Sequence, residues 1–177
     1  MTQLTFPGLL PPIVPPPLPA GAPSPLIHYP HVSGAVRAGH AKRIGAAGER
    51  LVDSFLLRWG FFPCEAPEAE AFDRLVLIGP DLLRLQVKTV THPRGGTFVF
   101  PMQQGYRRSP GGRHGYAEGA FDLAALVVLP ANVVAFTAER LDRHHVPAAA
   151  MDRLRRKPQA SFLDAIEAFR ARRDLSA

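Results

Sequence analysis

The stretch FDRLVLIGPDLLRLQVKTV, residues 72–90, decides the fold of this chain. It predicts two β-strands, Phe72–Ile78 and Leu82–Thr91, joined by a tight Gly-Pro-Asp turn. Side chains two apart in a strand point to the same face, so Gln86 and Lys88 emerge side by side. The leucines and valine that alternate with them face the other way, into a core.

The polar face of the second strand is expected to be partly covered. The first strand is apolar on both faces after Arg74, which is typical of a strand buried on both sides. The polar side chains of its neighbour, Arg84, Gln86 and Lys88, would then need partners. Asp73 precedes the apolar run of the first strand. With this carboxylate beside the Gln86 amide and the Lys88 amine, the hairpin predicts a cation site next to an amine that can handle a proton.

Composition favours one domain with residues to spare and a polyanionic partner. The chain has 177 residues, 46% of them hydrophobic, and a formal net charge of +6. A basic balance of this kind favours nucleic acid without proving it.

Cysteine usage and hydropathy indicate a reducing compartment. Cys64 is the single cysteine, which excludes an internal disulfide and a cysteine-based zinc cluster. Its apolar context predicts a buried, inert thiol. We find neither a convincing signal peptide nor an apolar stretch of about 20 residues that could span a membrane. A cytoplasmic location without membrane contact is expected.

A proline-rich, disordered tail is predicted for residues 1–33. Ten of the 19 prolines fall in the first 30 residues, a density that excludes a helix interior or a central strand. An extended, polyproline-like spacer is favoured over a PxxP ligand.

The spacing of apolar residues predicts a helix over Lys42–Trp59, ended by Gly60. Glu49 lies at the edge of its apolar stripe, at the border between the helix and whatever it packs on. Taken alone, Glu49 is more typical of a solvated glutamate on the helix rim.

The middle of the chain alternates strands with a long loop. After a short strand over Phe61–Ala66, the sequence predicts a strand over Thr97–Pro101 and a glycine-rich loop over Met102–Ala120. The loop is either a disordered insertion or a phosphate- and base-contacting segment. Its candidate DNA contacts are Tyr106, Arg107, Arg108 and Arg113.

The last third predicts strands followed by helices. Phe121–Leu129 is the most apolar strand, and Val133–Thr137 follows it. Helices are expected over Ala148–Arg156 and Ser161–Arg173, the second opened by a capping box of Ser161 with Asp164. The whole order indicates an α/β fold with a central mixed sheet flanked by helices.

Glu49, Asp73 and Gln86-x-Lys88, taken in this order on these elements, resemble the PD-(D/E)XK nuclease superfamily, in the branch of intron-associated homing endonucleases. The resemblance implies a restriction-endonuclease-like α-β-β-β-α-β core within residues 34–140. Residues 141–177 would be a basic, helical C-terminal extension.

The candidate site suits a hard divalent cation, which takes oxygen ligands and keeps several waters. Asp73, Gln86, the backbone carbonyl of Val87 and Glu49 are the candidate ligands for Mg²⁺, with Mn²⁺ as the alternative. Lys88 would position or activate the attacking water.

Two residues depart from the superfamily's pattern. Gln86 replaces the usual acid, which the homing endonuclease branch tolerates and which should weaken metal affinity, and Phe72 replaces the proline before the acid. The later Tyr106-Arg107 and Phe121-Asp122 segments resemble the family's own, which makes Asp122 a candidate supporting residue. Arg84 is a further candidate DNA contact.

The resulting hypothesis is a Mg²⁺-dependent endonuclease that hydrolyses double-stranded or branched DNA. The alternatives are a structure-specific nuclease of the Holliday-junction type and a catalytically inactive, nuclease-like DNA-binding module. A double-strand cut needs two active sites, so a homodimer or larger oligomer is expected.

Overall fold

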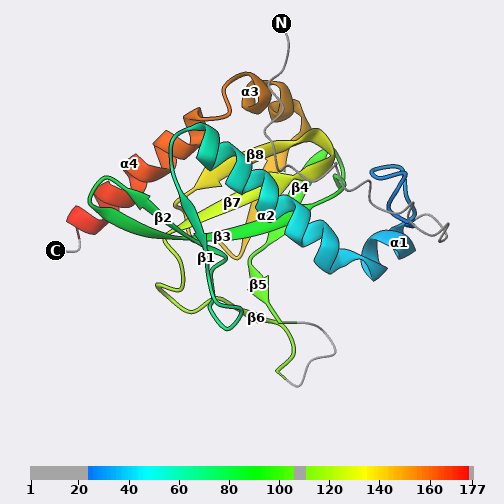
Figure 1. The fold of residues 1–177 in the computed structure, drawn as a ribbon, viewed down its shortest axis with the longest axis horizontal. Helices are drawn as coiled ribbons and strands as arrows, with labels where there is room; N and C mark the ends of the chain where they lie inside the picture. The colour runs from blue at the N-terminus through cyan, green and yellow to red at the C-terminus, as the bar shows by residue number, and fades with distance from the viewer. Residues whose placement is uncertain (1–23, 106–110, 176–177) are drawn as a thin grey trace, which may run out of the picture.

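A five-stranded mixed sheet forms the middle of the protein, with the strand order β1-β2-β3-β7-β8 (Figure 1). The computed structural model describes residues 24–105 and 111–175. All neighbouring strands are antiparallel except β3 and β7, which run parallel. The predicted fold class, a central mixed sheet with flanking helices, is confirmed. The strands are β1 (Pro63–Glu65), β2 (Arg74–Ile78), β3 (Asp81–Val90), β7 (Leu123–Val128) and β8 (Val133–Thr137).

Two helices, α2 (Ala41–Arg58) and α4 (Ala160–Asp174), cover one face of this sheet. Their apolar side chains, such as Leu56 and Phe162, pack against Leu83, Leu85 and Val87 of β3 in one core cluster. This face of β3 is therefore the apolar one, as its alternating pattern predicts.

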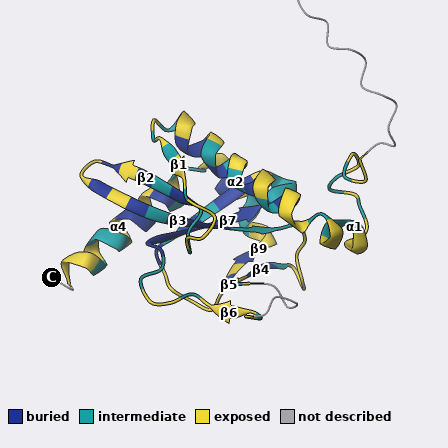
Figure 2. Cartoon of the chain, turned by 60° about the horizontal axis from the view of Figure 1, so that its bottom comes forward, coloured by how far each residue is buried: buried dark blue, intermediate teal, exposed yellow. Residues whose placement is uncertain are grey.

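The other face is covered by a second layer made of strands β4 (Thr97–Pro101) and β9 (Arg143–Pro147) and helix α3 (Met151–Arg156). Phe98, Phe100 and Leu154 pack there against Ala124, Leu126 and Val128 of β7. All six residues of β7 are buried, so β7 is covered on both faces, and Figure 2 shows it dark blue.

The connection from β3 to β7 differs from the α-β-β-β-α-β order. Its described residues, 91–105 and 111–122, contain no helix. They form β4, a strand with the predicted bounds, and then a small antiparallel hairpin of β5 (Gln103–Gln104) and β6 (His114–Gly115) within the segment predicted to be a loop. Glycines close the hairpin tightly: a Cβ on Gly105, whose φ is +80°, would lie 2.2 Å from the Gly112 carbonyl oxygen.

Two burial predictions are wrong. Leu77 and Leu82, paired across the β2–β3 turn, are each 60% exposed, so β2 is not covered on both faces. Cys64 is exposed on the edge strand β1 instead of buried. In both cases a local run of apolar residues suggests burial, but the second layer does not extend over this end of the sheet.

The C-terminal helices also begin differently from the prediction. Residues 148–150 form a 3-10 turn before α3, and a second 3-10 turn follows β7 at Leu129–Ala131. The Ser161 hydroxyl accepts a hydrogen bond from the Phe136 amide at 3.1 Å, so it joins α4 to β8 and does not cap the helix.

The N-terminal segment enters α2 through helix α1 (Gly34–Gly39), whose first turn is capped by the Ser33 hydroxyl. Residues 24–31 form hydrogen-bonded turns, which differ from the extended chain predicted there. The rest of the predicted proline-rich tail, residues 1–23, lies outside the described residues. Within residues 24–105 and 111–175, no helix is long and apolar enough to cross a membrane.

Candidate active site

The candidate site forms where β2 and β3 part. Their ladder ends with Arg74 opposite Leu85, and the Asp73 amide donates to the Leu85 carbonyl at 2.9 Å. Beyond this point β2 no longer pairs with β3, and the Val87 amide instead donates to Asp73 Oδ2 at 2.7 Å. The backbone of β3 therefore fixes this carboxylate in place.

The Gln86 side chain, 5% exposed, lies against the same carboxylate oxygen. Its Nε2 donates to Asp73 Oδ2 at 2.6 Å and to the Val87 carbonyl oxygen at 3.1 Å. Both partners are acceptors, so the amide must present its NH₂ group to them.

Two oxygens converging on one donor also suit a divalent cation, and a half-turn of the amide would bring the Gln86 Oε1 to the same point. The residues present therefore fit Mg²⁺. The described part of the chain holds no group of three or more His, Cys, Asp or Glu suited to a metal. Any site here thus depends on neutral carbonyl oxygens beside its acids.

Lys88 emerges on the same face of β3 as Gln86 and is covered by the β5–β6 hairpin. Its Nζ donates to the Gln103 carbonyl oxygen at 2.9 Å and lies 4.8 Å from the centroid of the Tyr116 ring. Burial lowers the pKa of Lys88, and the charge of Asp73 opposes this shift. Burial also raises the pKa of Tyr116, with Asp73 adding to the rise.

The negative charges of Asp73 and Glu49 are destabilised by burial, and a bound cation would stabilise them. Burial raises the pKa of Asp73 against the opposing effects of the Val87 amide and Lys88. Burial likewise raises the pKa of Glu49, and the negative charge of Asp73 adds to the rise while Arg74 opposes it. Both carboxylates are therefore easier to protonate than ordinary acids.

Arg74, 1% exposed, holds this arrangement together from the α2 side of the sheet. Its Nε and Nη2 bind the Asp53 carboxylate at 2.7 and 3.0 Å, and its Nη1 donates to the Asp73 carbonyl oxygen at 2.7 Å. The same Nη1 lies 3.2 Å from Glu49 Oε2. Sequence reasoning missed Arg74 and Asp53, although Asp53 follows Glu49 by one helical turn.

A close approach between α2 and β3 sets the position of Glu49. A Cβ on Gly48 would lie 2.0 Å from Thr89 Oγ1, closer than any real contact. Only glycine at this position lets the helix lie so near the strand, and Glu49 is the next residue.

Asp122 binds Arg84 through both its carboxylate and its backbone. Its carboxylate accepts the Arg84 amide at 2.8 Å and binds the Arg84 Nε and Nη2 at 3.1 and 2.9 Å. The Asp122 amide donates in return to the Arg84 carbonyl oxygen at 2.8 Å. The predicted support by Asp122 and DNA contact by Arg84 therefore compete for one guanidinium, and both stay predictions.

The predicted DNA contacts of the long loop are placed only in part. Arg113 is exposed and lies immediately before β6. Tyr106, Arg107 and Arg108 lie outside the described residues.

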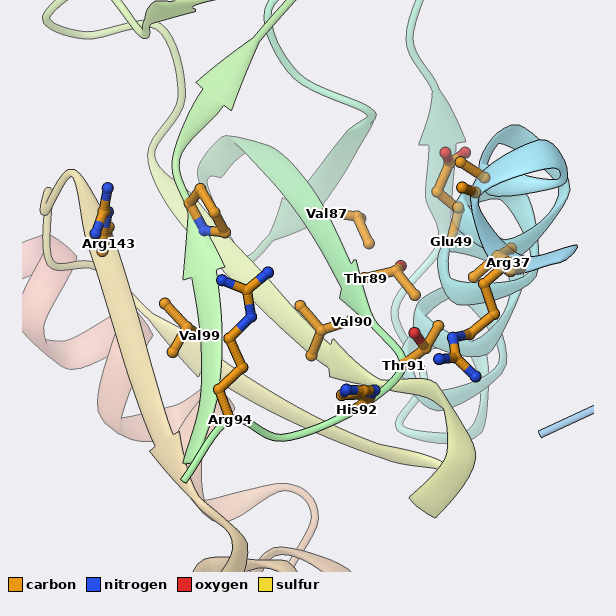
Figure 3. Close-up of a pocket in the computed structure, with 15 residues that line it drawn as sticks. Arg37, Glu49, Val87, Thr89, Val90, Thr91, His92, Arg94, Val99 and Arg143 are labelled. Atoms are coloured by element: carbon orange, nitrogen blue, oxygen red, sulfur yellow. The ribbon is translucent and has the colours of Figure 1, made fainter. Parts of the chain in front are cut away.

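A cleft of about 590 Å³ opens beside the site, between α1–α2 and the β4–β9 layer (Figure 3). Glu49 and Val87 belong to its lining, which connects it to the candidate ligands. Its basic residues are Arg37, His92, Arg94 and Arg143. Sequence reasoning missed these cleft residues, because they come from three separate elements.

No protein-family model and no curated protein sequence matches the chain. Among solved structures, the chain is similar to a bacterial homing endonuclease, I-Ssp6803I, with a TM-score of 0.52. The match has 17% sequence identity and covers 59% of this chain and 76% of the other. The predicted resemblance is confirmed at the level of the fold.

Proposed function

We propose that this chain is a Mg²⁺-dependent endonuclease that hydrolyses DNA phosphodiester bonds. The observation that carries the proposal is the convergence of the Asp73 carboxylate and the Val87 carbonyl on the Gln86 side chain. Lys88 follows on the same strand face. The fold shared with a homing endonuclease and the net charge of +6 support DNA as the substrate.

Asp73, Gln86, Val87 and Glu49 would hold Mg²⁺ or Mn²⁺. The bound cation supplies positive charge at phosphate oxygens and makes a bound water more acidic. Lys88 uses one of its three donors on Gln103, so the others are available to a water or to the phosphate. Oriented by Gln103 and the Tyr116 ring, Lys88 would hold the attacking water or stabilise the charge that develops on phosphorus-bound oxygens.

Asp73→Asn is the decisive test, because this change removes the charge and keeps the shape. Both hydrogen bonds to Asp73 end on Oδ2, so the single side-chain oxygen of asparagine can accept both. The raised pKa of Asp73 means that its ionised form costs stability near neutral pH. The variant should therefore melt no lower than the wild type.

We expect Asp73→Asn to lower Mg²⁺-dependent cleavage by a factor on the order of 10³. The assay compares supercoiled plasmid, linear duplex and four-way-junction DNA, each with Mg²⁺ or EDTA, and Lys88→Met provides a second inactive variant. Cleavage by a folded Asp73→Asn protein at the wild-type rate would refute the assignment. Faster cutting of the junction would indicate a structure-specific nuclease, and light scattering would report the expected dimer or larger assembly.

A catalytically inactive DNA-binding module is the second candidate, and one observation favours it. The Gln86 NH₂ group satisfies both oxygens without any cation. Gln86→Glu distinguishes an active nuclease from an inactive DNA-binding module, because it places a third carboxylate in the site. If the wild type is an active enzyme, the substitution shifts the Mg²⁺ concentration needed for cleavage. If it is an inactive module, cleavage is absent in the wild type and appears only in Gln86→Glu.

A further inference from the structure

The cleft beside the active site contains arginine side chains that the fold itself does not use. In the part of the chain that the structure describes, no hydrogen bond or ion pair involves the guanidinium of Arg94 or Arg143. The arginines on the sheet and on α4 behave differently: Arg74 binds Asp53, Arg84 binds Asp122, and Arg170 binds Asp81.

The unused guanidinium groups lie on the wall of the cleft that faces α2. Figure 3 shows Arg94, Val99 and Arg143 on the strands β4 and β9 and their approach, with Arg37 and Glu49 across the cleft on the helical side. Arg37 uses its Nη1 on the Val32 carbonyl and keeps its other donors. Positive charge thus stands on both walls.

The other lining residues complete the chemistry of the cleft. Thr89 and Thr91 contribute hydroxyls, and Val90 and Val99 contribute apolar surface. No phenylalanine, tyrosine or tryptophan belongs to the described lining, and the imidazole of His92 is the one aromatic ring in it. Glu49 and Val87, which also line the cleft, belong to the proposed cation site.

We propose that this cleft binds the phosphodiester backbone of duplex DNA and leads one strand to the site, with Arg37, Arg94 and Arg143 as phosphate contacts. Guanidinium groups bind phosphate oxygens through paired donors, and their contacts fix position without reading sequence. The described lining has arginines on both walls and a single imidazole in place of a row of aromatic rings, which favours a paired backbone over a single strand. This inference rests on the proposed nuclease function.

The test measures binding separately from cleavage. Asp73→Asn serves as the parent protein, and fluorescence anisotropy follows its binding to a labelled duplex over a range of KCl concentrations. The cleft variant adds Arg37→Ala, Arg94→Ala and Arg143→Ala. The matched control removes the same charge from exposed residues of α3 and its C-cap, with Arg153→Ala, Arg156→Ala and Lys157→Ala.

Each phosphate contact contributes about 0.9 to the slope of log K against log salt concentration, so losing three should lower the slope by about 2.7. We expect this change, and at least about tenfold weaker binding, in the cleft variant but not in the α3 control. Because Arg37 also contacts Val32, the pair Arg94→Glu with Arg143→Glu repeats the test with α1 intact.

An unchanged slope in both cleft variants would overturn this inference, and Asp73-dependent cleavage by the wild type would still support the proposed function. Tighter binding of a single-stranded oligonucleotide than of the duplex would also overturn it. Failure of the parent protein to bind any DNA, with no cleavage by the wild type, would overturn both proposals.

Discussion

Arginines at the two sides of Glu49 serve opposite purposes. On the α2–β2 side, Arg74 is almost fully buried and binds Asp53, Glu49 and the Asp73 carbonyl oxygen. On the cleft side, Arg94 has no acceptor among the described residues. The first arginine meets its acceptors within the fold, whereas the second presents its donors to the cleft.

The difference separates charges that position the site from charges available to a ligand. A buried guanidinium is stable only when its donors are satisfied, so removing it leaves its carboxylates without a partner. A solvated guanidinium costs the fold little to keep and little to lose. Glu49 takes part in both regions, because it contacts Arg74 and lines the cleft.

The largest expected effect comes from Arg74→Met, which keeps the stem and removes the charge. Asp53 and Glu49 lose their shared cation, so the free energy of unfolding should fall by about 3 kcal/mol. Urea denaturation measures this. Arg94→Ala is the control, and its stability should stay within about 0.5 kcal/mol of the wild type.

A double-mutant cycle of Arg74→Met with Asp53→Asn sharpens the result. The two changes should be strongly non-additive, because each removes the same bidentate pair. Equal destabilisation by Arg74→Met and Arg94→Ala would remove the distinction between the two kinds of arginine.

The next effect concerns the helix that places Glu49. In Gly48→Ala, the new Cβ meets Thr89 Oγ1 at 2.0 Å, and rotating Thr89 does not help, because its Cβ and Cγ2 are 3.0 and 3.1 Å away. The higher helix propensity of alanine stabilises α2 by about 1 kcal/mol and offsets part of this clash. We therefore expect the free energy of unfolding to fall by about 1–2 kcal/mol and cleavage to be reduced.

Gly45→Ala on the same helix is the matched control, because its Cβ would meet nothing within 4 Å. It should raise the free energy of unfolding by up to about 1 kcal/mol. Equal effects of the two substitutions would show that α2 does not depend on this close approach.

The smallest effect is a pH dependence. Because the pKa of Glu49 is raised, the stability it contributes is full below the ordinary glutamate pKa and is lost as pH rises through the folded value. Relative to Glu49→Gln, the wild type should therefore lose stability from acid towards neutral pH, as urea denaturation across pH would measure. Added Mg²⁺ should restore it in the wild type more than in the variant. If the wild type instead gained stability relative to Glu49→Gln as pH rises, the ion pair of Glu49 with Arg74 would have a larger effect on the pKa of Glu49 than burial has.

Local patterns in the sequence predict the elements that build the site. Strict alternation in β3 separates Leu85 and Val87 from Gln86 and Lys88, and the helical spacing around Glu49 predicts α2. The structure brings Asp73, Gln86 and Val87 into contact. These features depend on neighbouring residues, so periodicity is enough to find them.

Other features depend on distant residues and were missed for that reason. β9, with the sequence RHHVP, becomes a strand through its pairing with β4, about 45 residues earlier in the chain. Arg74 looks like an ordinary polar start of a strand until α2 presents Asp53 to it. Leu77 and Leu82 look like core residues, but no second layer reaches them.

The ion pairs between α4 and the β2–β3 turn bear on the order in which parts of the chain fold. Arg170 and Arg173 of α4 bind Asp81 at the turn, and Phe162 shares one core cluster with Leu56 of α2. The principal core therefore cannot close until α4 has docked against α2 and the sheet. Contacts of such long sequence separation form late in folding, so we expect α2 and the β2–β3 hairpin to reach their final packing only once α4 has docked.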